Sequence, residues 1–175
     1  MSLPKIIVLT GASGAGKTTL ALRLNELGIP GVEAINCDRV KLEANEHTDP
    51  SDVQADVLRH WITHLTRSES NVQLGVLDTQ IRPHRALEVL NEAGIKNAQV
   101  VLVDCDPVIR NERLHVDRGQ PELAHARMDC WAAYLRGQAD ALSLSIIDTS
   151  DGQVDKSLNT LERLVRDLLN GASPH

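Results

Sequence analysis

The segment GASGAGKTT, at residues 11–19, constrains the fold of this 175-residue chain more than any other feature. Glycines at positions 11, 14 and 16 precede Lys17 and Thr18, so the segment fits the pattern G-x-x-x-x-G-K-[ST] at every position. Residues without a Cβ atom let backbone N–H groups wrap around a phosphate group. The apolar run KIIVLT precedes the segment and a helical pattern follows it, which is the strand–loop–helix context this pattern requires. The sequence therefore predicts a phosphate-binding loop.

The side chains of this loop suit a nucleoside triphosphate with a divalent metal ion. Lys17 can reach the β- and γ-phosphate oxygens, and the Thr18 hydroxyl can coordinate Mg²⁺. Thr19 follows at the helix N-terminus, where the helix dipole favours anions. We therefore expect ATP and Mg²⁺ as cofactors. The expected nucleotide-binding residues are Gly11, Ala12, Ser13, Gly14, Ala15, Gly16, Lys17, Thr18 and Thr19.

Short apolar runs alternate with amphipathic helical patterns along the whole chain, which is typical of an α/β protein with a parallel sheet. The expected strands cover residues 5–10, 32–37, 72–78, 97–106 and 144–148. The expected helices run from the glycine loop to near residue 28, and over about residues 50–65, 83–93, 107–117, 121–141 and 154–168. With no linker or repeat, residues 1–175 read as a single domain.

Composition narrows the partners and the location. The formal net charge of −6, with no Phe, one Tyr and two Trp, argues against a nucleic-acid or membrane surface. Three widely spaced cysteines fit neither a disulfide framework nor a metal site, and the chain has no apolar run of membrane-spanning length. We expect a cytoplasmic protein, either a monomer or a homodimer.

The phosphate loop alone does not indicate which reaction the protein catalyses. The rest of the sequence has to distinguish a GTPase switch, a motor ATPase and a phosphotransferase. The N-K-x-D and D-x-x-G elements of GTPase switches are missing, since Asp78 has no glycine three residues on. Motor ATPases usually need a longer chain. These observations favour a small phosphotransferase.

Two downstream segments resemble the adenylate kinase-like group of small P-loop kinases, which includes nucleoside monophosphate, shikimate and gluconate kinases. The segment from Asp78 to Arg82 is similar to the D-G-F-P-R element of the nucleotide kinases, with Thr79 at the glycine position. The segment ERLHVDRG, which contains Arg113 and Arg118, resembles the E-R-L-x-x-R-G element that leads into their lid. The final strand segment SIIDTS resembles the segment before their adenine-contacting loop.

This resemblance implies a three-layer P-loop NTPase fold with a five-stranded parallel sheet in the order 2-3-1-4-5 and a short lid. It implies acceptor binding by about residues 38–70 and a lid over about residues 117–137. The implied catalytic residues are Lys17, Asp78, Arg113 and Arg118. Thr18 and Asp78 would hold the metal, and Asp38 and Arg82 would bind the acceptor.

The acceptor itself stays open. The segment INCDRVKLE departs from the T-G-D-x-x-R of the nucleotide kinases, so a metabolite, sugar acid, nucleotide or antibiotic are all consistent with the sequence. The alternative to a transferase is a regulatory or toxin-related NTPase without a small-molecule acceptor. An RNA-end kinase is a third option, which the acidic balance disfavours. Single arginines of the lid could equally lie on solvated helix faces.

Overall fold

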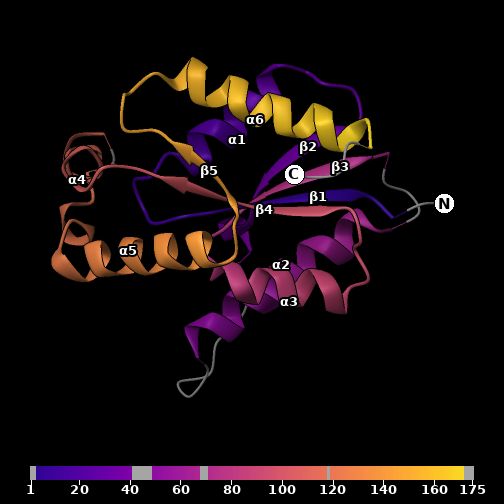
Figure 1. The fold of residues 1–175 in the computed structure, drawn as a ribbon, viewed down its shortest axis with the longest axis horizontal. Helices are drawn as coiled ribbons and strands as arrows, with labels where there is room; N and C mark the ends of the chain where they lie inside the picture. Colours follow the sequence, from indigo (N-terminus) through magenta and orange to yellow (C-terminus); the bar gives the residue numbers. More distant parts are fainter. Residues whose placement is uncertain (1–2, 41–48, 68–70, 118, 172–175) are drawn as a thin grey trace.

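The computed structural model describes residues 3–40, 49–67, 71–117 and 119–171, and within them a five-stranded parallel sheet lies between two layers of helices (Figure 1). The strand order is β2-β3-β1-β4-β5, which confirms the expected order. The strands are β1 (Lys5–Thr10), β2 (Val32–Asn36), β3 (Leu74–Asp78), β4 (Ala98–Asp104) and β5 (Ser145–Asp148). The α-helices are α1 (Lys17–Glu26), α2 (Pro50–Leu65), α3 (Pro83–Glu92), α4 (Pro107–Val116), α5 (Ala126–Ala141) and α6 (Val154–Leu169).

The central strand β1 divides its side chains between two hydrophobic layers. Because side chains alternate along a strand, Ile7 and Leu9 pack with α1 and α6 on one face of the sheet. Ile6 and Val8 pack with α2 and α3 on the other face. All four side chains are fully buried. Covering both faces with helices explains why the strand is a continuous apolar run.

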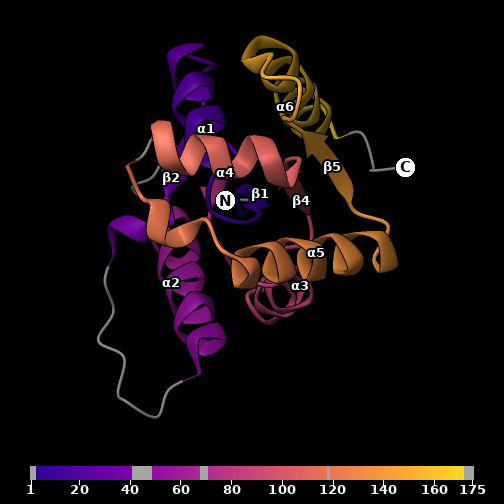
Figure 2. The same ribbon diagram turned by 90° about the vertical axis from the view of Figure 1, so that its left-hand side faces the viewer.

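The carboxyl ends of the parallel strands meet at one edge of the sheet. Helix α4 crosses this edge between α1 and α5, as Figure 2 shows from that side. The glycine loop after β1 and the turns after β3, β4 and β5 therefore come together beside α4. This is the edge at which open α/β sheets bind their ligands.

One expected helix is divided in the structure. Residues 121–141 form a short 3₁₀ turn, η2 (Pro121–Leu123), and then α5, which begins at Ala126. The break has a local cause, because His125 adopts an extended backbone conformation and its Nδ1 accepts a hydrogen bond from the Met128 N–H at 3.1 Å. His125 thereby caps the helix that starts after it.

Among the described residues, no helix is long and apolar enough to cross a membrane.

Candidate active site

The loop between β1 and α1 has a backbone that requires glycine. Gly11, Gly14 and Gly16 have φ angles of 152°, 82° and 100°, which side chains of L-residues rarely tolerate. A Cβ on Gly11 would lie 2.2 Å from the Val103 carbonyl oxygen, so β4 leaves no space for one. Gly16 caps α1 without a side-chain hydrogen bond, and the first turn of α1 carries no acidic residue. The N-terminal N–H groups of α1 can therefore face an anion.

Lys17 folds back across this loop. Its side chain is 6% exposed, and its Nζ donates hydrogen bonds to the carbonyl oxygens of Gly11 at 2.8 Å and Ala12 at 3.1 Å. The ammonium group is thus held against the backbone of the loop that would receive a phosphate group. Ala12 and Ala15 are buried beside it, and the Ser13 hydroxyl lies 3.4 Å from Gln80 Oε1, its hydrogen-bond acceptor.

Thr18 and Asp78 bring two oxygen ligands together. The Thr18 hydroxyl donates a 2.7 Å hydrogen bond to Asp78 Oδ2, and Asp78 is only 3% exposed. The register of the sheet explains the approach, because Asp78 at the end of β3 pairs with Leu9 at the end of β1. A hydroxyl and a carboxylate are the hard oxygen donors that Mg²⁺ prefers. Among the described residues, no group of three or more acidic, histidine or cysteine side chains could hold a metal ion.

Asp38 lies close to the same edge on the short 3₁₀ turn η1 (Cys37–Arg39). Asn36 pairs with Asp78 in the sheet, so the turn begins directly beside the end of β3. Burial raises the pKa of the Cys37 thiol, and the negative charges of Asp78 and then Asp38 raise it further. The carboxylates of Asp78 and Asp38 therefore both lie near the Cys37 thiol. The side chain of Asp38 is exposed.

Arg82 lies farther along the turn after β3, immediately before α3. Its guanidinium carbon lies 5.9 Å from the ring centroids of both Trp131 and Tyr134 on α5. The two rings are stacked, with centroids 5.5 Å apart. Arg82 is thus held against an aromatic pair, an arrangement that stabilises the cation.

Arg113 reaches from α4 to the turn after β5. Its Nη1 donates to Thr149 Oγ1 at 2.9 Å and its Nη2 donates to the Thr149 carbonyl oxygen at 2.6 Å. Nη1 is also 3.9 Å from the point where a Cβ of Gly16 would stand. The guanidinium group therefore lies directly beside the phosphate loop.

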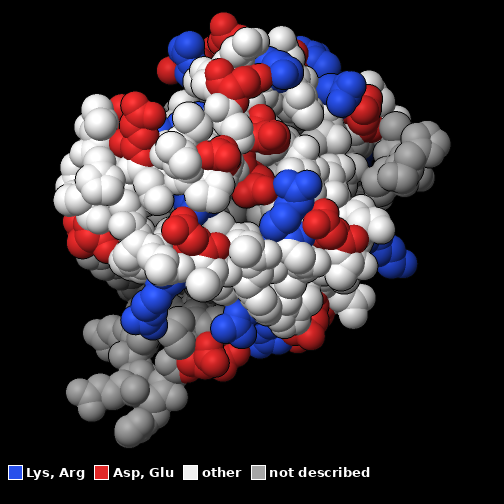
Figure 3. All heavy atoms as spheres, turned by 60° about the vertical axis from the view of Figure 1, so that its left-hand side comes forward, with Lys and Arg blue, Asp and Glu red and all other residues white. Residues whose placement is uncertain are grey.

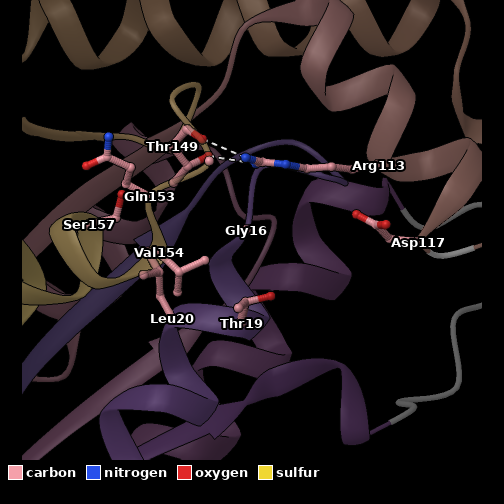
Figure 4. A pocket seen from close by; sticks show the side chains of 10 residues that line it. Gly16, Thr19, Leu20, Arg113, Asp117, Thr149, Gln153, Val154 and Ser157 are labelled. Atoms are coloured by element: carbon pink, nitrogen blue, oxygen red, sulfur yellow. Dashed lines mark hydrogen bonds between the residues drawn. The ribbon is translucent and has the colours of Figure 1, made fainter.

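These contacts form one wall of a cavity of about 300 Å³ (Figure 4). Its floor includes Thr19 and Leu20 of α1, and the segment after β5 contributes Gln153 and Val154. Val154 is 37% exposed, so it offers apolar surface opposite the polar wall. A cavity of this size with an apolar side, a planar cation and an amide can accommodate a nucleobase.

Two other arginines of the α4–α5 region form ion pairs with acidic residues. Arg118 lies outside the described residues. Arg110 is 1% exposed and forms an ion pair with Asp129. Arg136 pairs with Asp104 and Asp140 on the surface. Of the arginines that the resemblance indicated, Arg113 lies beside the phosphate loop at Gly16. The stem of Arg110 also packs on the loop, since a Cβ on Gly14 would lie 2.9 Å from its Cγ atom.

Sequence reasoning missed Thr149 and Gln153 as lining residues. The resemblance of SIIDTS to a segment before an adenine-contacting loop was a signal for this region, but it did not single out these side chains. The pair His60 and His64 belongs to no metal cluster among the described residues, and both rings lie edge-on to Trp61.

Three comparisons relate the chain to known proteins. The sequence of residues 7–129 matches the family described as AAA domain. No curated protein matches the sequence. Among solved structures, shikimate kinase from Acinetobacter baumannii in complex with shikimate is similar with a TM-score of 0.62 and 19% identity over 94% of both chains.

Two further kinases have similar structures. A gluconokinase from Sinorhizobium meliloti 1021 aligns with a TM-score of 0.61 and 18% identity, over 99% of this chain and 100% of that chain. The APS kinase CysC of Mycobacterium tuberculosis, in complex with AMPPNP and APS, has a TM-score of 0.56 and 19% identity, over 95% of this chain and 99% of that one. These likenesses establish a P-loop NTPase fold of the kind found in small kinases. Since the match to residues 7–129 covers more than half of the sequence, the chain belongs to the AAA domain family of P-loop proteins.

Proposed function

We propose that this protein is an ATP-dependent phosphotransferase that moves the γ-phosphate to a small-molecule acceptor. The proposal rests mainly on the positions of Thr18 and Thr19, which are neighbours on α1 but contact different parts of one site. Thr18 bonds to Asp78 at the end of β3, whereas Thr19 lines the base-sized cavity. A nucleotide with its base in that cavity would extend its phosphates past Gly16 toward Lys17 and Asp78.

The charges at this edge suit phosphoryl transfer. In such reactions the protein mainly positions the partners and neutralises charge that develops on the phosphate oxygens. Lys17 and Arg113 would supply positive charge from two sides of the loop. Thr18 and Asp78 would hold a Mg²⁺ ion, which would supply further positive charge for the phosphate groups. We assign a lid to about residues 117–137, with Arg118 as a further cation, to exclude water.

The acceptor would bind at the carboxyl ends of β2 and β3, within a segment of about residues 38–70 and the turn after β3. Asp78 borders this region and could orient the acceptor hydroxyl or accept its proton. Asp38 and Arg82 would contact the remainder of the acceptor. We propose that the acceptor is a metabolite, sugar acid, nucleotide or antibiotic. We further propose a cytoplasmic enzyme, monomeric or homodimeric, with its three thiols free.

The face beside α4 does not favour a polynucleotide acceptor. Acidic and basic side chains alternate over the described part of this face, which shows no continuous basic stripe (Figure 3). A polynucleotide backbone would require such a stripe.

A turnover assay tests the proposal. ATP consumption is measured against a panel of sugars, sugar acids, nucleosides, nucleotides and aminoglycosides. We expect one class to stimulate consumption, and we expect Lys17→Met to abolish the stimulated rate. Lys96→Met, which removes an exposed lysine between α3 and β4, is the matched control. A basal rate that no acceptor raises favours the NTPase without an acceptor, and full turnover in Lys17→Met contradicts both readings.

A further inference from the structure

Thr149 lies at the junction of the base-sized cavity and the phosphate loop. It follows β5 directly and is 7% exposed. Its backbone N–H donates to the Asp104 carbonyl oxygen at 3.0 Å, which fixes the residue against the end of β4. Its carbonyl oxygen accepts a 3.2 Å hydrogen bond from the Gly152 N–H, which shapes the turn that carries Gln153 and Val154.

The Thr149 hydroxyl reaches across to the phosphate loop. It donates a buried 2.8 Å hydrogen bond to the carbonyl oxygen of Ala15, a residue 134 positions earlier in the sequence. The Asp104 carbonyl oxygen, at 3.2 Å, is a second and longer acceptor for the same proton. The Thr149 methyl group lies 3.6 Å from the point where a Cβ of Gly16 would stand.

The orientation of the Ala15 carbonyl controls the next N–H group. In a planar trans peptide, the C=O of one residue and the N–H of the next point in opposite directions. A carbonyl of Ala15 held toward Thr149 therefore directs the Gly16 N–H away from Thr149. Gly16 is the N-cap of the helix that would receive the phosphates, so this N–H is part of the proposed anion-binding backbone.

The same hydroxyl holds the guanidinium group of Arg113. The hydroxyl donates its single proton to Ala15 and accepts from Arg113 Nη1 on a lone pair. Arg113 Nη2 binds the Thr149 carbonyl oxygen as well, so the two nitrogens grip one residue (Figure 4). The cavity wall and the phosphate loop are thus joined through a single side chain.

We propose that Thr149 is a positioning residue that couples occupation of the base-sized cavity to the conformation of the phosphate loop. The inference rests on the proposed function, because it needs a nucleotide that spans both parts. A base against Arg113 stabilises the Arg113–Thr149 contact. That contact in turn stabilises the hydrogen bond that orients the Ala15–Gly16 peptide for phosphate binding.

Two probes that each carry half of the nucleotide test the coupling. Tripolyphosphate reports on the loop and adenosine on the cavity, and both dissociation constants are measured by calorimetry. With wild-type protein, saturating adenosine should tighten tripolyphosphate binding by about fivefold. Wild-type protein that binds both probes independently would overturn this inference while leaving the proposed function standing. Failure of wild type to bind either probe would overturn both.

Variants then assign the coupling to the hydroxyl group. Thr149→Val keeps the side-chain shape but leaves the buried Ala15 carbonyl oxygen without this donor, so tripolyphosphate binding should weaken about tenfold. Thr149→Val should also lose the coupling between the two probes. Thr149→Ser, which retains the hydroxyl, should behave as wild type.

Thr63→Val removes an exposed hydroxyl that also bonds to a carbonyl oxygen, and it controls for the loss of such a bond elsewhere. A Thr149→Ser protein as impaired as Thr149→Val, or a Thr149→Val protein with intact coupling, contradicts the proposal. Should Thr149→Val not fold, the wild-type coupling and Thr149→Ser still decide it.

Discussion

Thr18 Oγ1 and Asp78 Oδ2 lie 2.7 Å apart although 60 residues separate them in the sequence. The contact joins the first turn of α1 to the end of β3, the strand paired with β1. It places a carboxylate and a hydroxyl beside the lysine of the phosphate loop. In our proposal these two oxygens hold the metal that shields the phosphates.

The first prediction concerns the charge of Asp78. Asp78→Asn preserves shape and an acceptor for Thr18 but removes the negative charge. We expect kcat to fall about 100-fold, because the metal loses its charged ligand, while binding of metal-free ATP changes less than threefold. Steady-state kinetics over a range of Mg²⁺ concentrations measure the effect. Asp167→Asn, an exposed acid on α6, is the control. An unchanged Mg²⁺ dependence in Asp78→Asn would remove the residue from the metal site.

The second prediction separates crowding from backbone strain at two glycines. Gly94 has a φ of 70° with nothing within 4 Å of an added Cβ, whereas the added Cβ of Gly11 would meet the Val103 carbonyl oxygen at 2.2 Å. Gly94→Ala should lower the free energy of unfolding by about 1 kcal/mol through strain alone. Gly11→Ala should lower it by about 2 kcal/mol more, because backbone atoms of β4 have to move. Urea denaturation measures both, and equal losses would disprove the close approach of loop and strand.

The third prediction concerns thiol reactivity. Burial raises the pKa values of Cys37 and Cys105, and the charges of Asp78 and Asp38 raise that of Cys37 further. A raised thiol pKa keeps the group protonated, and therefore unreactive, until the pH rises beyond its usual range. At about pH 8, iodoacetamide should thus label the exposed Cys130 first, with the other two protected until the protein unfolds. Mass spectrometry of peptides from a time course measures the order, and early labelling of Cys37 would contradict it.

The residues whose signals are local were predictable from the sequence. Strand β1 and the loop follow from the apolar run and the glycine spacing, and β1 occupies the expected residues 5–10. Pro83 and Pro107 mark the first turns of α3 and α4, as their fixed φ angle favours. The strand order came from the resemblance to known kinases, because nothing local specifies which strands are neighbours.

The contacts of Arg110 and Thr149 were not predictable from the sequence. Arginine is a residue type that is usually exposed, yet Arg110 is 1% exposed because Asp129, 19 residues away, neutralises its charge. Thr149 reads as an ordinary residue after a strand, and its importance depends on Ala15 at the other end of the chain. Such contacts exist only once the sheet has assembled, so no periodicity or motif indicates them.

The fate of the γ-phosphate tests the central claim most directly. ATP with a radiolabelled γ-phosphate is incubated with the protein, Mg²⁺ and the stimulating acceptor, and the products are separated by chromatography. A phosphotransferase predicts that the label appears in the organic acceptor and that little inorganic phosphate forms. Label recovered solely as inorganic phosphate, at a rate that Lys17→Met abolishes and no acceptor alters, would contradict transfer and identify a hydrolase.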